Sequence, residues 1–210
     1  MQIKTIPVGM LHTNCYLLID SQSKECAVID PGANSGRILE KIREIGVRPT
    51  HIILTHGHFD HVLAAPEVQR QTGARLLIHQ RDAHMLSPSI ARHPGYIRED
   101  YTQPRVDGFL EDGMAFKVGG LQCKALSTPG HTKGSCVILC GDVMFSGDTL
   151  FAGDCGRTDL EGGDMDEMME SLGRLYRLEG DYKVLPGHEE ATTLGEQRQV
   201  NPYMRRGAGV

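Results

Sequence analysis

Residues 55–61, with the sequence Thr-His-Gly-His-Phe-Asp-His, bring three imidazoles and one carboxylate into a short segment. The apolar run at 51–54 precedes them and is typical of a strand. Neutral imidazole and carboxylate are ligands that divalent zinc, iron and manganese accept. A polar surface turn is the alternative, because aspartate is also common in turns. So many ligating groups at the end of one strand favour a metal site over a simple turn.

The spacing within this segment indicates two adjacent metal positions. His56 and His58 flank Gly57 in an extended stretch, so both rings can turn to one side. A helix expected to start near residue 62 brings in Asp60 and His61, whose directions differ by about 100° because they are neighbours on a helix. These two side chains therefore face a different point from the first pair. Four ligands do not complete two sites, so others must come from elsewhere in the chain.

Three further turns after strand-like segments carry histidine or aspartate. His131 follows a Pro-Gly pair, Asp148 follows Ser-Gly, and His188 follows another Pro-Gly pair. Each turn alone is ordinary, because glycine, proline and aspartate are typical turn residues. Together with residues 55–61 they make four strand-end turns that all carry potential ligands, which favours one shared centre.

Hydrophobic periodicity predicts the elements that position these turns. Strands are expected at 3–8, 15–20, 26–30, 51–54, 75–79, 114–118, 121–127, 135–140, 143–146 and 183–185, and helices at 35–45, 64–72, 80–86, 165–177 and 193–200. Residues 87–112 lose periodicity, and we expect them to form a lid over the metals, since long irregular stretches in compact domains are usually functional loops. Residues 205–210 are expected to form a short, frayed C-terminal tail.

Composition favours a compact enzyme made of one domain, residues 1–210, with 40% hydrophobic residues available for a core. The formal charge of −5 provides no basic surface for a nucleic acid. Residues 1–8 contain no long apolar run, so we expect no signal peptide, no membrane partner and a cytoplasmic location. The six cysteines should then be free thiols, and Cys155, close to the expected site, is the candidate for a reactive one.

The motifs His-x-His-x-Asp-His at 56–61, Thr-Pro-Gly-His-Thr at 128–132, Ser-Gly-Asp-Thr-Leu-Phe at 146–151 and Pro-Gly-His at 186–188 resemble, in this order, those of the metallo-β-lactamase superfamily of hydrolases. Residues 147–151, 156–159 and 162–164 look most like the short bacterial glyoxalase II-like (hydroxyacylglutathione hydrolase-like) proteins. The resemblance covers residues 28–196. It implies an α/β fold of the αββα type, in which two mixed β-sheets are flanked by helices; periodicity alone predicts only mixed α and β structure.

The resemblance also implies a ligand set for two divalent metal ions, with zinc expected and iron or manganese as alternatives. One ion would be held by His56, His58 and His131, the second by Asp60, His61 and His188, with Asp148 bridging the two. A water or hydroxide would complete the bridge, because two cations bring its pKa toward about 7. Asp60 and Asp148 would be the catalytic residues. Asp30 would orient a ligand from behind, although a plain turn aspartate is an equal alternative.

The activity implied is thioester hydrolysis of the glyoxalase II type on a small acyl-thiol substrate, giving a carboxylate and a free thiol. Arg157 is the candidate anchor for an anionic substrate group, because a guanidinium can clamp a carboxylate with paired hydrogen bonds. A surface ion pair is the alternative for this residue.

Two other functions remain as alternatives. Persulfide dioxygenases share this scaffold and use one iron, which by resemblance would be held by His56, His131 and Asp148. A non-hydrolytic metal-binding protein is the second alternative, and it is disfavoured because every ligand position is filled.

Overall fold

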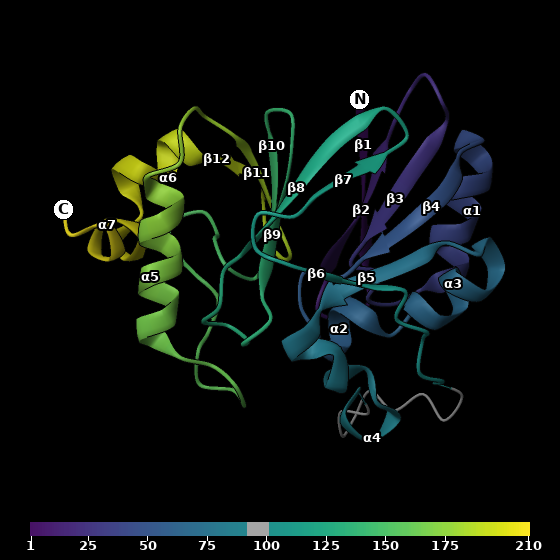
Figure 1. Cartoon of the computed structure of the whole chain (residues 1–210), viewed down its shortest axis with the longest axis horizontal. Coiled ribbons are helices and arrows are strands. Elements are labelled where there is room, and N and C mark those ends of the chain that lie inside the picture. Colours follow the sequence, from purple (N-terminus) through teal and green to yellow (C-terminus); the bar gives the residue numbers. More distant parts are fainter. Residues whose placement is uncertain (92–100) are drawn as a thin grey trace.

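Two six-stranded sheets face each other and carry helices on their outer surfaces (Figure 1). This computed structural model describes residues 1–91 and 101–210. The first sheet has the order β1 (Gln2–Val8), β2 (Thr13–Ile19), β3 (Glu25–Ile29), β4 (Arg48–Ile53), β5 (Arg75–His79) and β6 (Gly108–Leu110). Its first two pairings are antiparallel and the remaining three are parallel.

The second sheet has the order β12 (Thr192–Thr193), β11 (Lys183–Pro186), β10 (Val143–Gly147), β9 (Cys136–Cys140), β8 (Leu121–Ser127) and β7 (Ala115–Val118). Only the pairing of β10 with β11 is parallel. Because parallel neighbours end at the same edge, the turns after β10 and β11 emerge side by side, as do those after β3, β4 and β5.

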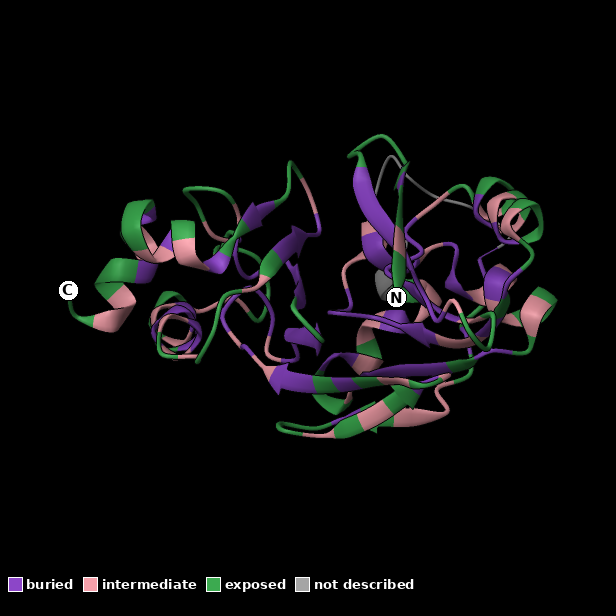
Figure 2. Ribbon diagram, turned by 90° about the horizontal axis from the view of Figure 1, so that it is seen from above, coloured by how far each residue is buried: buried purple, intermediate pink, exposed green. Residues whose placement is uncertain are grey.

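Three apolar clusters hold the layers together. Strand β2 illustrates the alternation, since Leu17 packs toward the helices of the first layer and Leu18 packs between the sheets. Phe145 of β10 meets Leu18 in the central cluster, and its ring lies edge-on to Tyr16 with centroids 5.3 Å apart. Figure 2 shows the buried residues concentrated along the strands and the inner faces of the helices. The αββα arrangement is therefore confirmed.

The outer helices have the amphipathic sequences that this packing needs. The first sheet is covered by α1 (Ser35–Ile45) and α3 (Ala65–Thr72), which bury residues such as Ile38 and Val68. The second sheet is covered by α5 (Met165–Tyr176), α6 (Leu194–Val200) and α7 (Pro202–Ala208). Among the described residues, no helix combines the length and apolar character that crossing a bilayer requires.

The lid expected at 87–112 stays a prediction, because the structure describes only parts of this segment. After the 3-10 helix η1 (Gln80–Leu86) comes α4 (Pro88–Ala91), and residues 92–100 lie outside the described part of the chain. Tyr101 is buried, and Arg105 and Asp107 hydrogen-bond Gln69 of α3 on the outer side of the first sheet. β6 then joins the sheet edge. Periodicity missed β6 because a three-residue strand is too short to show alternation.

The expected frayed tail is wrong, because the last residues form α7, which packs along α5. Asn201 caps α7 by accepting hydrogen bonds from the amides of Tyr203 and Met204. Two glycines then allow close contact, since a Cβ on Gly173 would lie 2.2 Å from the carbonyl oxygen of Gly207. Met204 is fully buried in the same contact region.

Replacing Gly173 with alanine is expected to destabilise the protein by about 1–3 kcal/mol, because the added methyl group must push α7 away from α5. Without this contact the replacement would be expected to stabilise the protein, because alanine is favoured over glycine within a helix by about 1 kcal/mol. Urea unfolding measures the change in the free energy of unfolding. The control is Gly36→Ala in α1, where an added Cβ meets nothing within 4 Å and stability should be kept or increased. Equal stability changes in the two variants would contradict the packing argument.

Candidate metal centre

The potential ligands of the first sheet lie in the loop between β4 and α3. His56 and His58 follow the end of β4, and the short helix α2 (Phe59–Val62) carries Asp60 and His61. This helix starts earlier than the helix expected near residue 62. It packs tightly on the turn after β3, because a Cβ on Gly32 would lie 1.5 Å from the carbonyl oxygen of Asp60.

The second sheet supplies three more ligands from three strand ends. His131 follows β8 on a turn held by α5, since Ser171 donates a hydrogen bond to the carbonyl of Pro129 at 2.7 Å. Asp148 and His188 follow the parallel strands β10 and β11 and emerge together. The backbone between them is tightly packed, because a Cβ on Gly187 would lie 2.1 Å from Oδ1 of Asp148.

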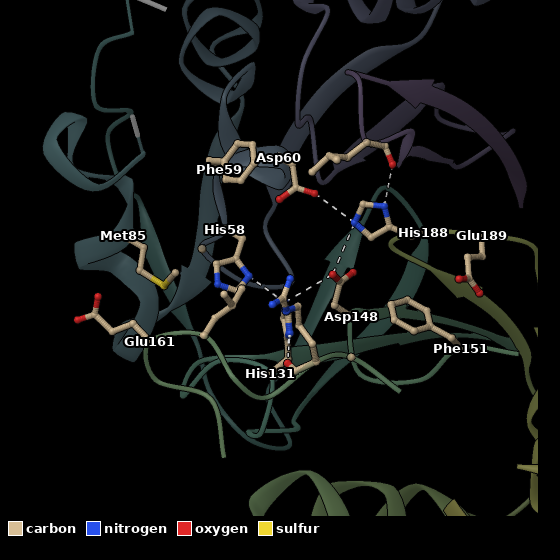
Figure 3. Close-up of a pocket in the computed structure, with 15 residues that line it drawn as sticks. His58, Phe59, Asp60, Met85, His131, Asp148, Phe151, Glu161, His188 and Glu189 are labelled. Atoms are coloured by element: carbon tan, nitrogen blue, oxygen red, sulfur yellow. Dashed lines mark hydrogen bonds and ion pairs between the residues drawn. The ribbon is translucent and has the colours of Figure 1, made fainter. Parts of the chain in front are cut away.

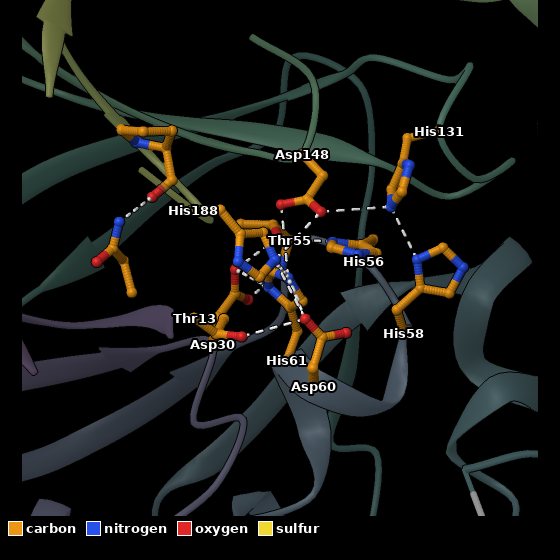
Figure 4. Close-up of polar contacts among 12 residues, drawn as sticks. Thr13, Asp30, Thr55, His56, His58, Asp60, His61, His131, Asp148 and His188 are labelled. Carbon is orange, nitrogen blue, oxygen red and sulfur yellow. Dashed lines mark hydrogen bonds and ion pairs between the residues drawn. The ribbon is translucent and has the colours of Figure 1, made fainter. Parts of the chain in front are cut away.

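The structure brings all seven predicted ligands into one cluster between the ends of the sheets (Figure 4). Three groups have ligand atoms within 4.8 Å of one another: His56 with His58 and His131, His56 with His61 and Asp148, and Asp60 with His61 and His188. Asp148 faces both sides, because its two oxygens lie 3.5 Å from Nε2 of His61 and 3.5 Å from Nε2 of His131. The arrangement therefore offers adjacent positions that share a carboxylate.

Hydrogen bonds orient four of the imidazoles so that their Nε2 atoms face the cluster. Nδ1–H of His131 donates to the carbonyl of Arg157 at 2.7 Å, and that of His188 donates to the carbonyl of Leu11 at 3.1 Å. Nδ1–H of His61 donates to the carboxylate of Asp30 at 3.0 Å. In His56 the corresponding partner is the hydroxyl of Thr55. Each acceptor places the proton on Nδ1, which leaves the Nε2 lone pairs available to a cation.

Two buried atoms in the cluster have no hydrogen-bond partner among the described residues, Nε2 of His56 and Oδ1 of Asp148. Leaving such groups unpaired costs about 1–3 kcal/mol each, so proteins rarely bury them without a ligand. Both atoms point into the centre of the cluster, and both are Lewis bases. The residues present therefore fit divalent cations bound by imidazole and carboxylate groups.

Burial and neighbouring charges set the protonation of the cluster. Burial, reinforced by the other imidazoles, lowers the pKa of His56 well below its usual value and that of His58 to about 3. Burial also opposes a charge on His61, but the carboxylates around it, Asp148 foremost, raise its pKa to about 10. Burial disfavours ionised Asp60, yet neighbouring groups, His61 foremost, hold its pKa below the usual range. A divalent cation in place of the His61 proton would satisfy the same carboxylates.

Asp30 and Thr55 form the support behind the ligands. The carboxylate of Asp30 is buried, and it accepts hydrogen bonds from the amide of Thr55 at 2.8 Å and from its hydroxyl at 2.7 Å. The contact with His61 makes Asp30 the orienting partner of a ligand, as the resemblance implies, in place of a plain turn residue.

Asp82 is a site residue that sequence reasoning missed. It lies in η1 with 1% exposure, and its Oδ2 accepts hydrogen bonds from the amide of Gly57 at 3.0 Å and the hydroxyl of Thr132 at 2.6 Å. Its Oδ1 accepts one from the amide of Gly134 at 2.8 Å. The carboxylate thus ties the loop of His56 and His58 to the loop of His131. No spacing signal marks it, since a single aspartate in a short helix has no pattern.

A cavity of about 710 Å³ opens onto the cluster. Figure 3 shows His58, Asp60, His131, Asp148 and His188 at its base. Its other walls are mainly apolar and come from Leu11, Gly57, Phe59, Met85, Phe151, Gly156 and Leu160. Glu161 and Glu189 lie at its edges. None of the residues 87–89 and 101–112 lines this cavity.

The surroundings of Arg157 and Cys155 do not match the roles expected from the sequence, which were an anion anchor and a reactive thiol. Arg157 lines the cavity, but its exposed guanidinium pairs with Asp159 through two hydrogen bonds of 2.7 Å, which is the ion-pair alternative. Cys155 is half-buried against the third apolar cluster, and burial raises the pKa of its thiol to about 12. A thiol with a raised pKa forms less thiolate near neutral pH, which disfavours the reactive role expected from the sequence.

Comparison with known proteins places the chain among relatives of similar length. The model of the Metallo-beta-lactamase superfamily matches residues 8–188. Hydroxyacylglutathione hydrolase GloC of Haemophilus influenzae is 32% identical over 97% of this chain and 98% of its own. The crystal structure of the BLEG-1 B3 metallo-beta-lactamase has 31% identity, a TM-score of 0.89, and coverage of 97% of this chain and 99% of that one. TTHA1623 in a di-iron-bound form has 32% identity, a TM-score of 0.84, and coverage of 95% and 99%.

Replacing Asp82 with alanine is expected to weaken metal binding by about 10- to 100-fold, because the loops carrying His56, His58 and His131 lose their common anchor. Competition with a chromophoric chelator measures the affinity of the metal-loaded protein.

Asp20→Ala is the matched control for this variant. Asp20 accepts hydrogen bonds from the amide of Gly120 and the hydroxyl of Ser23, but it follows the far end of β2, away from the cluster. Its loss should lower the melting temperature and leave metal affinity unchanged. If Asp82→Ala binds metal as tightly as the unmodified protein, Asp82 has no role in holding the ligands.

Proposed function

Because this chain belongs to the metallo-β-lactamase superfamily, we propose that it is a metal-dependent thioester hydrolase of the glyoxalase II type. The observation that carries the proposal is the position of Asp148 between the histidines of two ligand groups, at the base of an open cavity. The substrate is a small acyl-thiol, and the products are a carboxylate and a free thiol.

In this proposal two divalent cations share the cluster. The first would be held by His56, His58 and His131 and the second by Asp60, His61 and His188, with Asp148 available to both. When bound, the cations polarise the thioester carbonyl and lower the pKa of the attacking water. We propose zinc, since imidazole and carboxylate suit it, with iron or manganese as alternatives. The similarity to a protein in a di-iron-bound form supports iron as an alternative.

The chain's own residues hold the reacting groups in place. Asp60 and Asp148 line the cavity, where as catalytic residues they orient the attacking water by accepting hydrogen bonds. The hydroxyl of Thr13 donates to Asp60 at 3.1 Å and restricts its carboxylate. Phe59 and Phe151 form walls that exclude bulk water, which strengthens the polar interactions at the base of the cavity.

A second candidate is a persulfide dioxygenase with one iron. The observation that favours it is the proximity of the three residues it would need. The rings of His56 and His131 have centroids 4.8 Å apart, and Nε2 of His131 lies 3.5 Å from Asp148. Oxygen uptake with glutathione persulfide, together with one iron per chain, would replace the hydrolase proposal with this one.

Protein purified without added metal is expected to contain about two divalent ions per chain by elemental analysis. Removing these ions with a chelator should abolish thioester hydrolysis, because the attacking water and the thioester carbonyl both lose their activation. Adding zinc should restore the activity. Failure of metal-loaded protein to cleave any thioester would contradict the proposed function.

Replacing Asp148 with alanine is expected to lower kcat/KM by at least about 100-fold, because the carboxylate common to both cation positions is lost. Steady-state hydrolysis of a thioester, followed by release of the free thiol, measures the effect. The control is Asp142→Ala, an exposed aspartate in the turn at the other end of β10, which should keep full activity. Wild-type activity in Asp148→Ala would remove this residue from the site.

A further inference from the structure

The upper walls of the cavity present apolar side chains to solvent. Leu11, in the β1–β2 turn, is 44% exposed, and Leu160, in the loop before α5, is 40% exposed. Both line the cavity, together with Phe59, Met85 and Phe151 deeper inside. Apolar side chains gathered around one opening mark a binding surface, because their exposure to water is unfavourable until an apolar ligand covers them.

The charged groups at the edge of the cavity do not favour an anion. Glu161 lies on the side of Met85 and Glu189 on the side of Phe151 (Figure 3). Within residues 1–91 and 101–210, neither carboxylate has a hydrogen bond or ion pair, and both side chains are exposed where they line the cavity. Histidines aside, Arg157 is the one cationic side chain among the described residues that line the cavity.

The charge of Arg157 is already balanced. Its Nε and one terminal nitrogen each donate to Asp159 at 2.7 Å, which occupies the paired donors that would clamp a carboxylate. The edge of the cavity therefore carries two unpaired negative charges and one neutralised positive charge. The proposed cations lie at the base of the cavity, where the acyl carbonyl binds, whereas the thiol carrier lies at the edge. Glutathione, with two carboxylates and one ammonium, has a net charge of about −1 and would meet repulsion from Glu161 and Glu189 at that edge.

We infer that the site selects an apolar acyl group on a thiol carrier that has no net negative charge. This inference rests on the proposed thioester hydrolysis and specifies its substrate class. The oxygen of water forms a bond to the acyl carbon, the carbon–sulfur bond breaks, and the products are a carboxylate, the neutral thiol and one proton. The apolar walls hold the acyl chain, and the carrier extends past Glu161 and Glu189 toward solvent.

The test uses metal-loaded full-length protein and one acyl series on three carriers. The carriers are glutathione, which is anionic, N-acetylcysteamine, which is neutral, and thiocholine, which is cationic. From acetyl to hexanoyl, kcat/KM is expected to rise roughly fourfold per methylene while the chain remains within the walls. At equal acyl length, the neutral and cationic carriers should exceed glutathione by about tenfold, and this preference should shrink at high salt.

Charge-removing variants test the assignment of the two glutamates. The double variant Glu161→Gln with Glu189→Gln should raise kcat/KM for the glutathione thioester by about two- to fivefold, with little change for the N-acetylcysteamine thioester. Glu190→Gln is the matched control, because Glu190 is exposed and adjacent in sequence but does not line the cavity. Leu160→Ser should reduce the increase in kcat/KM for each added methylene of the acyl chain. The ranking of the three carriers by kcat/KM should stay the same.

The outcomes separate this inference from the proposed function. Efficient cleavage with glutathione as the preferred carrier, unaffected by the glutamate variants, would overturn the inference and leave the thioester hydrolase in place. No cleavage of any thioester on any carrier would overturn the proposed function, and the inference with it.

Discussion

The hydrogen bonds made by Thr55 connect the two sheets at the cluster. Its amide and hydroxyl donate to the buried carboxylate of Asp30, and its carbonyl accepts a hydrogen bond of 2.8 Å from the amide of Cys136 in the second sheet. Gly147 packs against the same side chain, since a Cβ there would lie 2.5 Å from the Thr55 hydroxyl oxygen. Thr55 thus helps to fix the distance between the sheets directly beside the ligands, together with Asn14 and Tyr16 of β2, which donate hydrogen bonds to the carbonyls of Gly187 and Pro186. If this spacing changed, ligands from β4 would no longer meet those from β10 and β11.

The cluster contains buried charged groups, and burying these charges would cost free energy if the oppositely charged groups were absent. Burial disfavours charge on the imidazoles and on the carboxylates alike, and the attraction between His61 and the carboxylates around it offsets part of that cost. The backbone carbonyls and Asp30 then determine which nitrogen of each ring faces inward. The geometry of the site is therefore set by ordinary main-chain turns, which the rigid sheet ends hold in position.

Much of this arrangement could be predicted from sequence, and the exceptions have physical reasons. His131, Asp148 and His188 were predictable because strand ends with Pro-Gly or Ser-Gly turns leave a distinctive local pattern. Asp82 was not, because its role depends on two loops that meet only in the folded chain. The contact of α7 with α5 was missed for a similar reason, since helix formation there depends on the closeness that Gly173 and Gly207 permit.

The walls of the cavity and the ligands at its base come largely from different segments. Leu11 lies in the β1–β2 turn, and residues 151–161 form a loop outside the sheets, whereas the ligands sit at strand ends supported by buried hydrogen bonds. The wall segments contact the ligands through the backbone carbonyls of Leu11 and Arg157, so substitutions that change only side chains such as Leu11 and Leu160 can accumulate while these hydrogen bonds persist. Such a division makes the scaffold evolvable, because new substrate preferences can arise while the chemistry is inherited intact.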